Sequence, residues 1–293
     1  MGSPPNRRLV RQMLAEFIGT FLLIFFGLGA VHAAVLTGAQ SGVWQIAIIW
    51  GIAIMLAIYC VAGVSGAHIN PAMTLSMACW RKFPGRLVVP YVVAQLLGSI
   101  AAASVLYFLF TGYLINKEST KQVVRGQAGS IVTAMCYGEY FPAPAQLANG
   151  DDAFSTEDFI QHKKLVTHQV AFVAEMLGTM ILAFVVFAVS DDRNNERPPA
   201  GNAAIFIGLT VSALISVLAP LTQACFNPAR DFGPRMFAFA AGWGQTAFPG
   251  IADISWLTVY IIAPCVGAVI GGGVYDLIIR PGLIPAKKML TKL

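Results

Sequence analysis

Six long apolar runs constrain the fold of this chain more than any other feature. Each is long enough to cross the hydrocarbon layer of a bilayer, which is about 30 Å thick and takes roughly 20 helical residues. Only 11% of the 293 residues are charged, which is too apolar a composition for one soluble core. We therefore predict an all-α integral membrane protein. Its six spans are expected at residues 9–36, 43–64, 87–110, 168–189, 202–219 and 256–279.

Basic residues gather at the ends of these predicted spans and indicate their orientation. The connection at 37–42 has no Lys or Arg, whereas the connections at 65–86 and 190–201 have several. By the positive-inside rule, both termini and these two basic connections face the cytoplasm. The long connection at 111–167 is then extracellular. The basic residues that carry this prediction are Arg7, Arg8, Arg11, Arg81, Lys82, Arg86, Arg193, Arg197, Lys287, Lys288 and Lys292.

Two motifs occur twice at nearly the same spacing. The string AEFIGT at 15–20 returns as AEMLGT at 174–179, and Asn-Pro-Ala at 70–72 returns at 227–229. Each half has three spans and one Asn-Pro-Ala segment, so the second half enters the membrane from the opposite side. Such inverted repeats place their site near the midplane, where the repeats meet. We predict one channel domain over 1–293, with a first repeat at 9–110, a connecting loop at 111–167 and a second repeat at 168–280.

The two Asn-Pro-Ala segments are predicted to begin re-entrant half-helices. Asparagine suits the cap position of a helix, and proline suits the first helical position, where its missing N–H is no loss. Non-helical backbone at membrane depth must be buried or line water. The loops leading into the half-helices should therefore line a pore, with the asparagine amides as donors. The expected motif residues are Asn70, Pro71, Ala72, Asn227, Pro228 and Ala229. The expected pore-lining carbonyls belong to Gly66, Ala67, His68, Gln223, Ala224 and Cys225.

Several charged residues fall inside the predicted membrane region, and four of them have predicted roles. Arg230 is costly at that depth, so we interpret it as a functional residue that, with the positive half-helix ends, repels cations. An ion pair between Arg230 and Asp231 is the alternative, and Asp231 is otherwise expected to be structural. Glu16 and Glu175 are the matching acids of the two repeats. We expect each to accept hydrogen bonds from the re-entrant loop of its own half.

The strings SGAHINPAMT at 65–74 and FNPARDFGPR at 226–235 closely resemble the two signature loops of the major intrinsic protein family, the aquaporins. The resemblance covers all six predicted spans. It implies the aquaporin fold, in which six helices and two half-helices form an inverted repeat. It also implies a homotetramer in the lipid bilayer, with one pore in each subunit.

Within that family, Asp231 and the string AGWG at 241–244 resemble the glycerol-conducting branch. The resemblance places the outer selectivity filter at Trp50, Ile215, Ala224 and Arg230. Bacterial glycerol facilitators have Gly and Phe where this chain has Ile215 and Ala224, and the set is more similar to plant nodulin-type channels. This implies a wide, amphipathic constriction that passes glycerol and water. A water-selective pore and a channel for metalloid acids or small acids are the alternatives.

Several other classes of function lack their sequence signatures. The chain has no GxxxxGK phosphate loop, no HExxH and no GxSxG, and its five cysteines form no CxxC pair. Its basic residues lie at span ends and not on one nucleic-acid-binding face. We therefore expect no catalytic residue, metal, cofactor or nucleic-acid partner. A bundle with an occluded pore is a further alternative. The expected location is a plasma membrane or a bacterial inner membrane.

Overall fold

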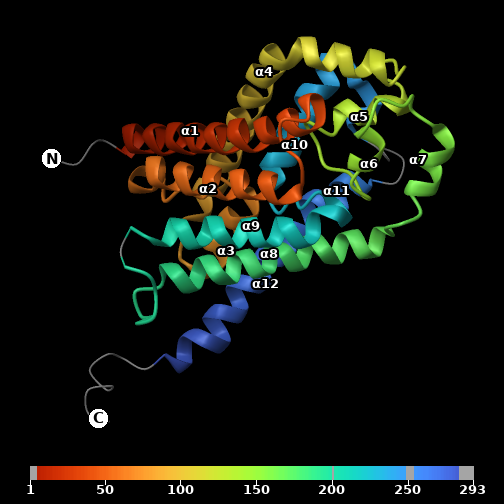
Figure 1. Cartoon of the computed structure of the whole chain (residues 1–293). Helices are drawn as coiled ribbons and strands as arrows, with labels where there is room; N and C mark the ends of the chain where they lie inside the picture. The colour runs from red at the N-terminus through yellow and green to blue at the C-terminus, as the bar shows by residue number, and fades with distance from the viewer. Residues whose placement is uncertain (1–4, 200, 249–253, 284–293) are drawn as a thin grey trace.

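The computed structural model describes residues 5–199, 201–248 and 254–283, and within these ranges all regular secondary structure is helical. Six long helical segments form a bundle (Figure 1). Five of them are α1 (Pro5–His32), α2 (Val43–Ser65), α4 (Val88–Thr120), α8 (His168–Ser190) and α9 (Ala203–Thr222). The sixth contains α11 (Ser255–Leu257) and α12 (Ala263–Val274), joined by a π-helical turn. Two shorter helices, α3 (Pro71–Trp80) and α10 (Pro228–Ala238), lie between them.

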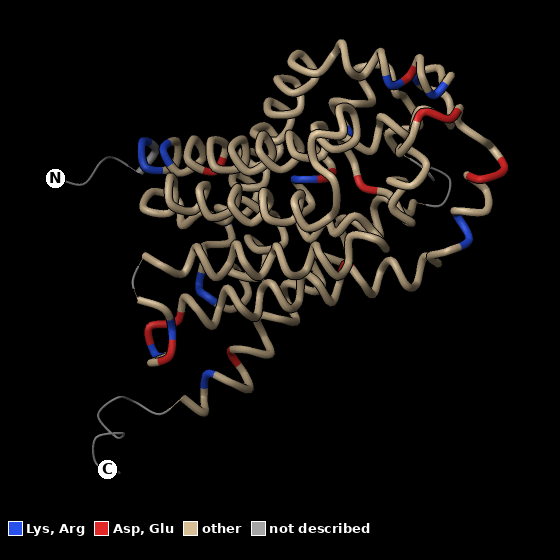
Figure 2. Tube along the Cα trace, in the orientation of Figure 1, with Lys and Arg blue, Asp and Glu red and all other residues tan. Residues whose placement is uncertain are grey.

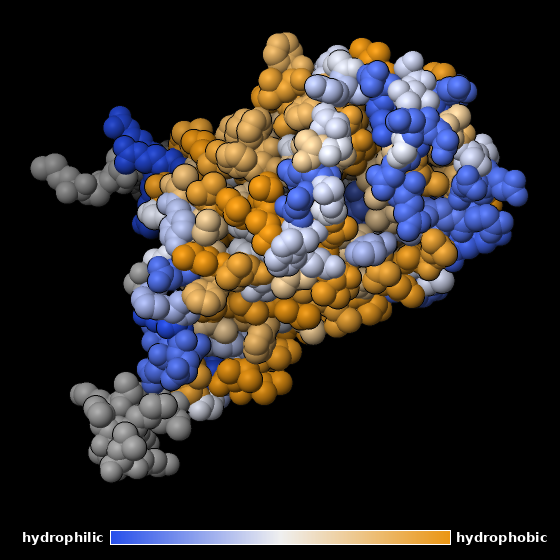
Figure 3. Space-filling model, viewed as in Figure 1, coloured by the Kyte–Doolittle hydropathy of each residue, from blue (hydrophilic) through white to orange (hydrophobic). Residues whose placement is uncertain are grey.

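All six long segments are apolar enough to cross a bilayer, which confirms the prediction of six spans. Charged residues gather at the two ends of the bundle and are few between them (Figure 2). Between these polar ends, the visible face of the bundle is largely hydrophobic (Figure 3). Large apolar side chains such as Phe108 and Val217 are 80% and 72% exposed. This surface requires a lipid solvent, since no soluble monomer would leave so much of it in water.

The third span is longer than its sequence prediction. It was expected to end at Phe110, but α4 continues to Thr120, within the predicted connecting loop. The extension is stabilised by tertiary contacts, because Leu114 is fully buried and Glu118 forms a 3.0 Å ion pair with Arg125. The rest of the connection folds back over the bundle through the short helices α5 (Ile131–Ala134), α6 (Ala145–Ala148) and α7 (Thr156–His162).

Small residues let the long helices approach closely. A Cβ at Gly51 of α2 would lie 2.6 Å from the carbonyl oxygen of Gly208 on α9, and the reverse contact would be 2.4 Å. Cβ atoms at Gly267 and Gly271 of α12 would come within about 2 Å of α8 carbonyl oxygens. Membrane helices pack through such small-residue contacts because lipid provides no hydrophobic drive between them.

The two halves interlock through their half-helices. The half-helix α3 of the first half packs against α12 of the second, and α10 of the second packs against α4 of the first. On α3, the Ser76 hydroxyl donates to the Ala268 carbonyl at 2.7 Å, and the Trp80 indole donates to the Val269 carbonyl at 2.9 Å. Each half-helix is thus held by the last span of the opposite half, which aligns the two ends at the centre of the bundle.

Candidate pore and selectivity filter

Both half-helices begin at the asparagine of an Asn-Pro-Ala motif. The Asn70 side chain accepts from the Ala72 amide at 2.8 Å, and the Asn227 side chain accepts from the Ala229 amide at 3.0 Å. The following proline stands in the first turn of each helix, as the sequence led us to expect. Capping therefore orients the two asparagines in the same way at the N-terminal ends of the half-helices.

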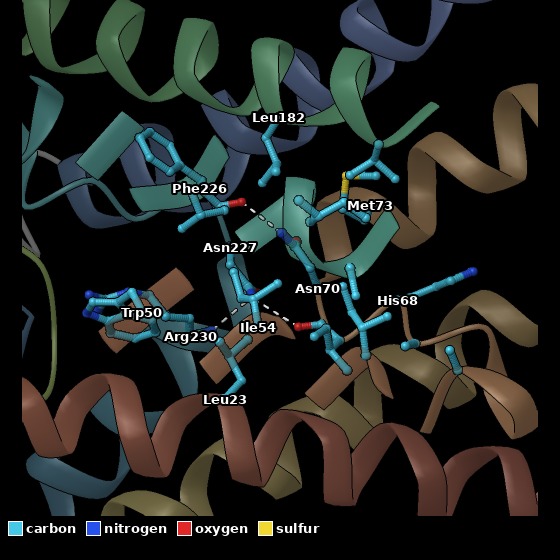
Figure 4. Close-up of a pocket in the computed structure, with 18 of the residues that line it drawn as sticks. Leu23, Trp50, Ile54, His68, Asn70, Met73, Leu182, Phe226, Asn227 and Arg230 are labelled. Atoms are coloured by element: carbon cyan, nitrogen blue, oxygen red, sulfur yellow. Dashed lines mark hydrogen bonds between the residues drawn. The ribbon is translucent and has the colours of Figure 1, made fainter. Parts of the chain in front are cut away.

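The two asparagines also join the halves to each other. The Asn70 amide donates to the Phe226 carbonyl at 2.9 Å, and the Asn227 amide donates to the Ile69 carbonyl at 2.9 Å (Figure 4). Sequence reasoning assigned these amides to the permeating solute and did not foresee this crossed pair. Each side-chain amide has two hydrogens, so one remains for a solute. Both asparagines line a cavity of about 420 Å³ that runs through the bundle.

Glu16 and Glu175 support the loops that precede these asparagines. Glu16 accepts from the His68 and Ile69 amides at 2.9 and 2.6 Å. Glu175 accepts from the Cys225 and Phe226 amides at 2.9 and 2.8 Å. Both carboxylates are fully buried. The two acids thus satisfy equivalent backbone donors at membrane depth, where an unpaired group costs several kcal/mol.

The repeated glycine in the two AExxGT strings has a matching role that the sequence did not reveal. A Cβ at Gly19 would lie 2.8 Å from the Ile69 side chain, and a Cβ at Gly178 would lie 2.1 Å from the Phe226 ring. Ile69 and Phe226 each come directly before the capping asparagine of their half. The glycine therefore leaves space for the re-entrant loop beside the glutamate that binds it, which explains why the two residues recur together.

The re-entrant loops have left-handed backbone at several non-glycine residues. The φ angles of Ala67 and Ile69 are 49° and 43°, and those of Ala224 and Phe226 are 58° and 55°. Such conformations persist only where surrounding contacts fix them, and they cluster at functional sites. Of the six predicted carbonyl residues, five line the central cavity: Gly66, Ala67, His68, Ala224 and Cys225. Gln223 lines an outer cavity, where its side chain accepts from the Tyr140 amide at 2.9 Å.

The predicted filter residues lie where the central and outer cavities meet. Trp50, Ile215 and Arg230 line both the central cavity and an outer vestibule of about 500 Å³, and Ala224 lines the central one. The Arg230 guanidinium stacks over the Trp50 ring, 4.4 Å from its centroid (Figure 4). The combination offers a cationic donor, an aromatic wall and two aliphatic side chains, an arrangement suited to a solute with both hydroxyl and carbon faces.

Glu139, and not Asp231, is the ion-pair partner of Arg230. One carboxylate oxygen of Glu139 contacts the Arg230 guanidinium, and both side chains are almost fully buried. Asp231 instead forms a 2.7 Å ion pair with Arg235. The alternative that paired Arg230 with Asp231 is therefore wrong, because Asp231 pairs with Arg235, which lies one helical turn further along α10.

Asp231 and Arg235 together hold the loop that carries Glu139. Asp231 accepts from the Glu139 backbone amide at 2.7 Å, and Arg235 donates to the Glu139 carbonyl. Arg235 also donates to the Ala247 carbonyl at 2.6 Å. Sequence reasoning missed Glu139, although it is the one charged residue between Arg125 and Asp151 in an otherwise apolar stretch. A lone acid in such a stretch is the signal that could have found it.

The histidines of the described chain do not gather with other possible metal ligands. Within the described residues, no group of three or more His, Cys, Asp or Glu side chains could hold a metal ion. The two histidines nearest the pore are engaged in packing. His68 contacts the rings of Phe83 and Tyr91, and His32 contacts those of Phe110 and Tyr137.

Comparisons with known proteins agree with this architecture. The glycerol uptake facilitator protein of Pseudomonas aeruginosa is 40% identical over 275 residues, which cover 94% of this chain and 91% of that protein. The propanediol uptake facilitator PduF of Citrobacter freundii is 40% identical over 278 residues, or 95% of each chain. The solved structure of the aquaglyceroporin from Plasmodium falciparum superposes with a TM-score of 0.76 and 26% identity, covering 93% of this chain and 98% of that one. The family model described as major intrinsic protein matches residues 5–275, and the chain belongs to that family.

Proposed function

We propose that this protein is a passive membrane channel for glycerol and other small uncharged solutes, together with water. The observation that carries the proposal is the junction between the two cavities. There, the Arg230 guanidinium faces the vestibule beside Trp50, while Ile215 completes an aliphatic side. A polyol presents hydroxyls that accept and donate hydrogen bonds, and a carbon chain that prefers apolar contact. The junction offers both kinds of surface.

Ion exclusion follows from the centre of the pore. The N-terminal ends of α3 and α10 meet there, and each carries a partial positive charge from its helix dipole. Arg230 adds a full positive charge at the filter. Its ion pair with Glu139 weakens the potential of this charge, but the guanidinium still lines the vestibule. Cations, including hydronium, therefore meet positive potential at two successive depths, whereas a neutral solute does not.

The names of the relatives favour a polyol over water alone. Two of them are named for uptake of glycerol and of propanediol, and the structural neighbour is an aquaglyceroporin. Ile215 supports the same reading, because an aliphatic side chain offers no hydrogen bond to a file of water. A water-selective pore would gain from a polar group at that place. Nothing in the proposed cycle requires chemical turnover, a cofactor or a coupled ion.

The setting of the channel is inferred from charge and from the family. The protein is an integral membrane protein, and we propose a plasma membrane or a bacterial inner membrane with both termini in the cytoplasm. The described chain begins and ends at the same end of the bundle, which agrees with an even number of spans (Figure 1). We also propose a homotetramer of single-domain subunits, each with its own pore.

The proposal is tested by light scattering of proteoliposomes that contain the purified protein. Vesicles are mixed rapidly with a hyperosmotic glycerol solution, and the re-swelling that follows their initial shrinkage is recorded. Re-swelling well above that of protein-free vesicles, with no swelling in sucrose, would support a polyol channel. Fast water flux with no glycerol flux would contradict it and indicate a water-selective pore.

A further inference from the structure

A second cavity of about 300 Å³ lies beside the vestibule in the extracellular cap, and we call it the side chamber. Its walls come from the loop around Tyr140, from α7 and from the starts of the fourth and last long helical segments, including His168 and Trp256. It is separate from the pore and from the filter junction. Only a few residues belong both to the side chamber and to the vestibule, and Glu139 and His162 are two of them.

Glu139 leaves a buried acceptor without a partner. Its Oε1 contacts Arg230, while its Oε2 is buried and has no hydrogen-bond partner among the described residues. The residue is only 1% exposed. A buried carboxylate oxygen without a donor is costly, and native structures seldom keep one without a ligand or water to satisfy it. A hydroxyl group in the side chamber would supply the missing donor.

His162 adds a second acceptor. Its Nε2 lies 3.0 Å from the Ala143 carbonyl oxygen. A carbonyl can only accept, so Nε2 carries a proton, and in the neutral form of the ring Nδ1 is the acceptor. Thr167 lies in the same wall, where its hydroxyl oxygen accepts from the Val170 amide and its hydrogen is left as a donor. Lys163 offers a further donor.

Aromatic side chains form the apolar part of the chamber. Phe141, Phe159 and Trp256 lie in its walls. Tyr140 also lines the chamber, but its hydroxyl donates to the Thr246 carbonyl at 2.8 Å and is not available to a ligand. Burial raises the pKa of Tyr140 well above its ordinary value, so the phenol stays neutral. The chamber therefore combines acceptors, donors and carbon-facing rings, while Lys163 opposes occupation by a cation.

We propose that the side chamber is an external binding site for a small neutral polyol, whose hydroxyl donates to the free oxygen of Glu139. The choice of ligand rests on the proposed function, but the site itself lies outside the conducting path. Because Glu139 also pairs with Arg230, the bound polyol sits one residue away from the filter. A donor on the free oxygen weakens the hold of Glu139 on Arg230 at the filter, so permeability rises with chamber occupancy and uptake is half-maximal at a concentration that the chamber affinity sets.

The test uses the full-length protein and a dense glycerol analogue, 3-bromopropane-1,2-diol. Crystals or frozen particles soaked at graded concentrations would show bromine between Glu139 and Trp256. His168→Trp fills the chamber with an indole, because His168 lines the chamber and not the vestibule. Gln161→Trp is the matched control, since Gln161 lies on the exposed surface of the same cap and lines neither cavity.

The expected result is chamber density in the wild type and in Gln161→Trp that disappears in His168→Trp. The glycerol concentration for half-maximal uptake should then rise several-fold in His168→Trp only. Bromine confined to the pore and vestibule would overturn the proposal. Chamber density at molar soaks only, with unchanged uptake in His168→Trp, would mean binding at crystal concentration only and would also overturn it. Absence of glycerol uptake by the wild type would contradict the proposed function. The bromine positions would still show whether the side chamber binds the diol.

Discussion

The centre of the pore and its outer filter are built in different ways. At the centre, the capping asparagines, the loop backbone and the supporting acids Glu16 and Glu175 of one half each have a counterpart in the other. The filter has no such symmetry. It takes Trp50 from α2, Ile215 from α9 and Arg230 from α10, and its ion-pair partner Glu139 comes from the long outer connection. The repeat fixes a common pore, and the unrepeated parts set what passes through it.

This difference predicts which substitutions destroy the protein and which change only its selectivity. Substitutions at the centre should lower the amount of folded protein, because each leaves buried backbone donors of its own half without an acceptor. Substitutions at the filter should leave the fold intact, because its side chains face a cavity. The predictions below run from the largest expected effect to the smallest.

Replacing either central glutamate should have the largest effect. Glu16→Ala and Glu175→Ala each leave two buried backbone amides without an acceptor, a loss of about 2–6 kcal/mol. We expect little folded protein from either variant, as measured by fluorescence-detected size-exclusion chromatography after heating. Glu175→Gln keeps one acceptor oxygen and should be intermediate. If both alanine variants were as stable as the wild type, the proposed equivalent role of the two glutamates would be wrong.

Filling the filter should abolish flux without loss of the fold. Ala224→Trp places an indole beside Trp50 and Arg230, where the two cavities meet. Glycerol re-swelling of proteoliposomes should fall to the level of empty vesicles. The control is Val217→Trp, which puts the same side chain on a 72% exposed, lipid-facing position of α9. Equal glycerol flux in the two variants would show that the filter lies elsewhere.

Removing the charge of Glu139 should weaken flux by an intermediate amount. Glu139→Gln keeps the shape of the side chain but leaves the buried Arg230 without its carboxylate partner. We expect glycerol permeability to fall roughly tenfold, the effect of about 1.4 kcal/mol in the barrier. Glu157→Gln on the exposed surface of α7 is the control. If both variants conduct like the wild type, Glu139 has no part in the filter.

An ion-pair cluster at the other end of the bundle should affect only stability. Asp191 lies 2.9 Å from Arg280 and 3.9 Å from Arg81. Burial opposes its ionisation, but the Arg193 amide and the two guanidiniums outweigh burial and lower the pKa of Asp191 below its ordinary value. A carboxylate with a lowered pKa stabilises the fold above its ordinary pKa of about 4, and this contribution is lost as the pH falls further.

Asp191→Asn should therefore lower the thermal midpoint by a few degrees at neutral pH and by less below about pH 4. Glycerol flux should change little, since Asp191 lines neither the central cavity nor the vestibule. Thermal unfolding of the two proteins across this pH range measures the effect. A stability difference that grows as the pH falls would contradict the assignment.

The repeated features of the fold were predictable from sequence, and the unrepeated ones were less so. The spans, the half-helices and the positions of Asn70 and Asn227 followed from hydrophobic length, capping preference and duplication. Glu139 did not, because its role depends on Asp231 and Arg235 drawing a distant loop onto α10. The extension of α4 was missed for a similar reason, since the buried Leu114 and the Glu118 ion pair are tertiary contacts.

The most direct test of the account compares glycerol and water flux in the wild type and Ile215→His. Stopped-flow light scattering of proteoliposomes gives both rates from the same preparation. Fast glycerol flux in the wild type, falling at least tenfold in Ile215→His while water flux persists, would establish an amphipathic polyol filter at this position. Glycerol flux unchanged by the histidine, or absent from the wild type, would contradict it.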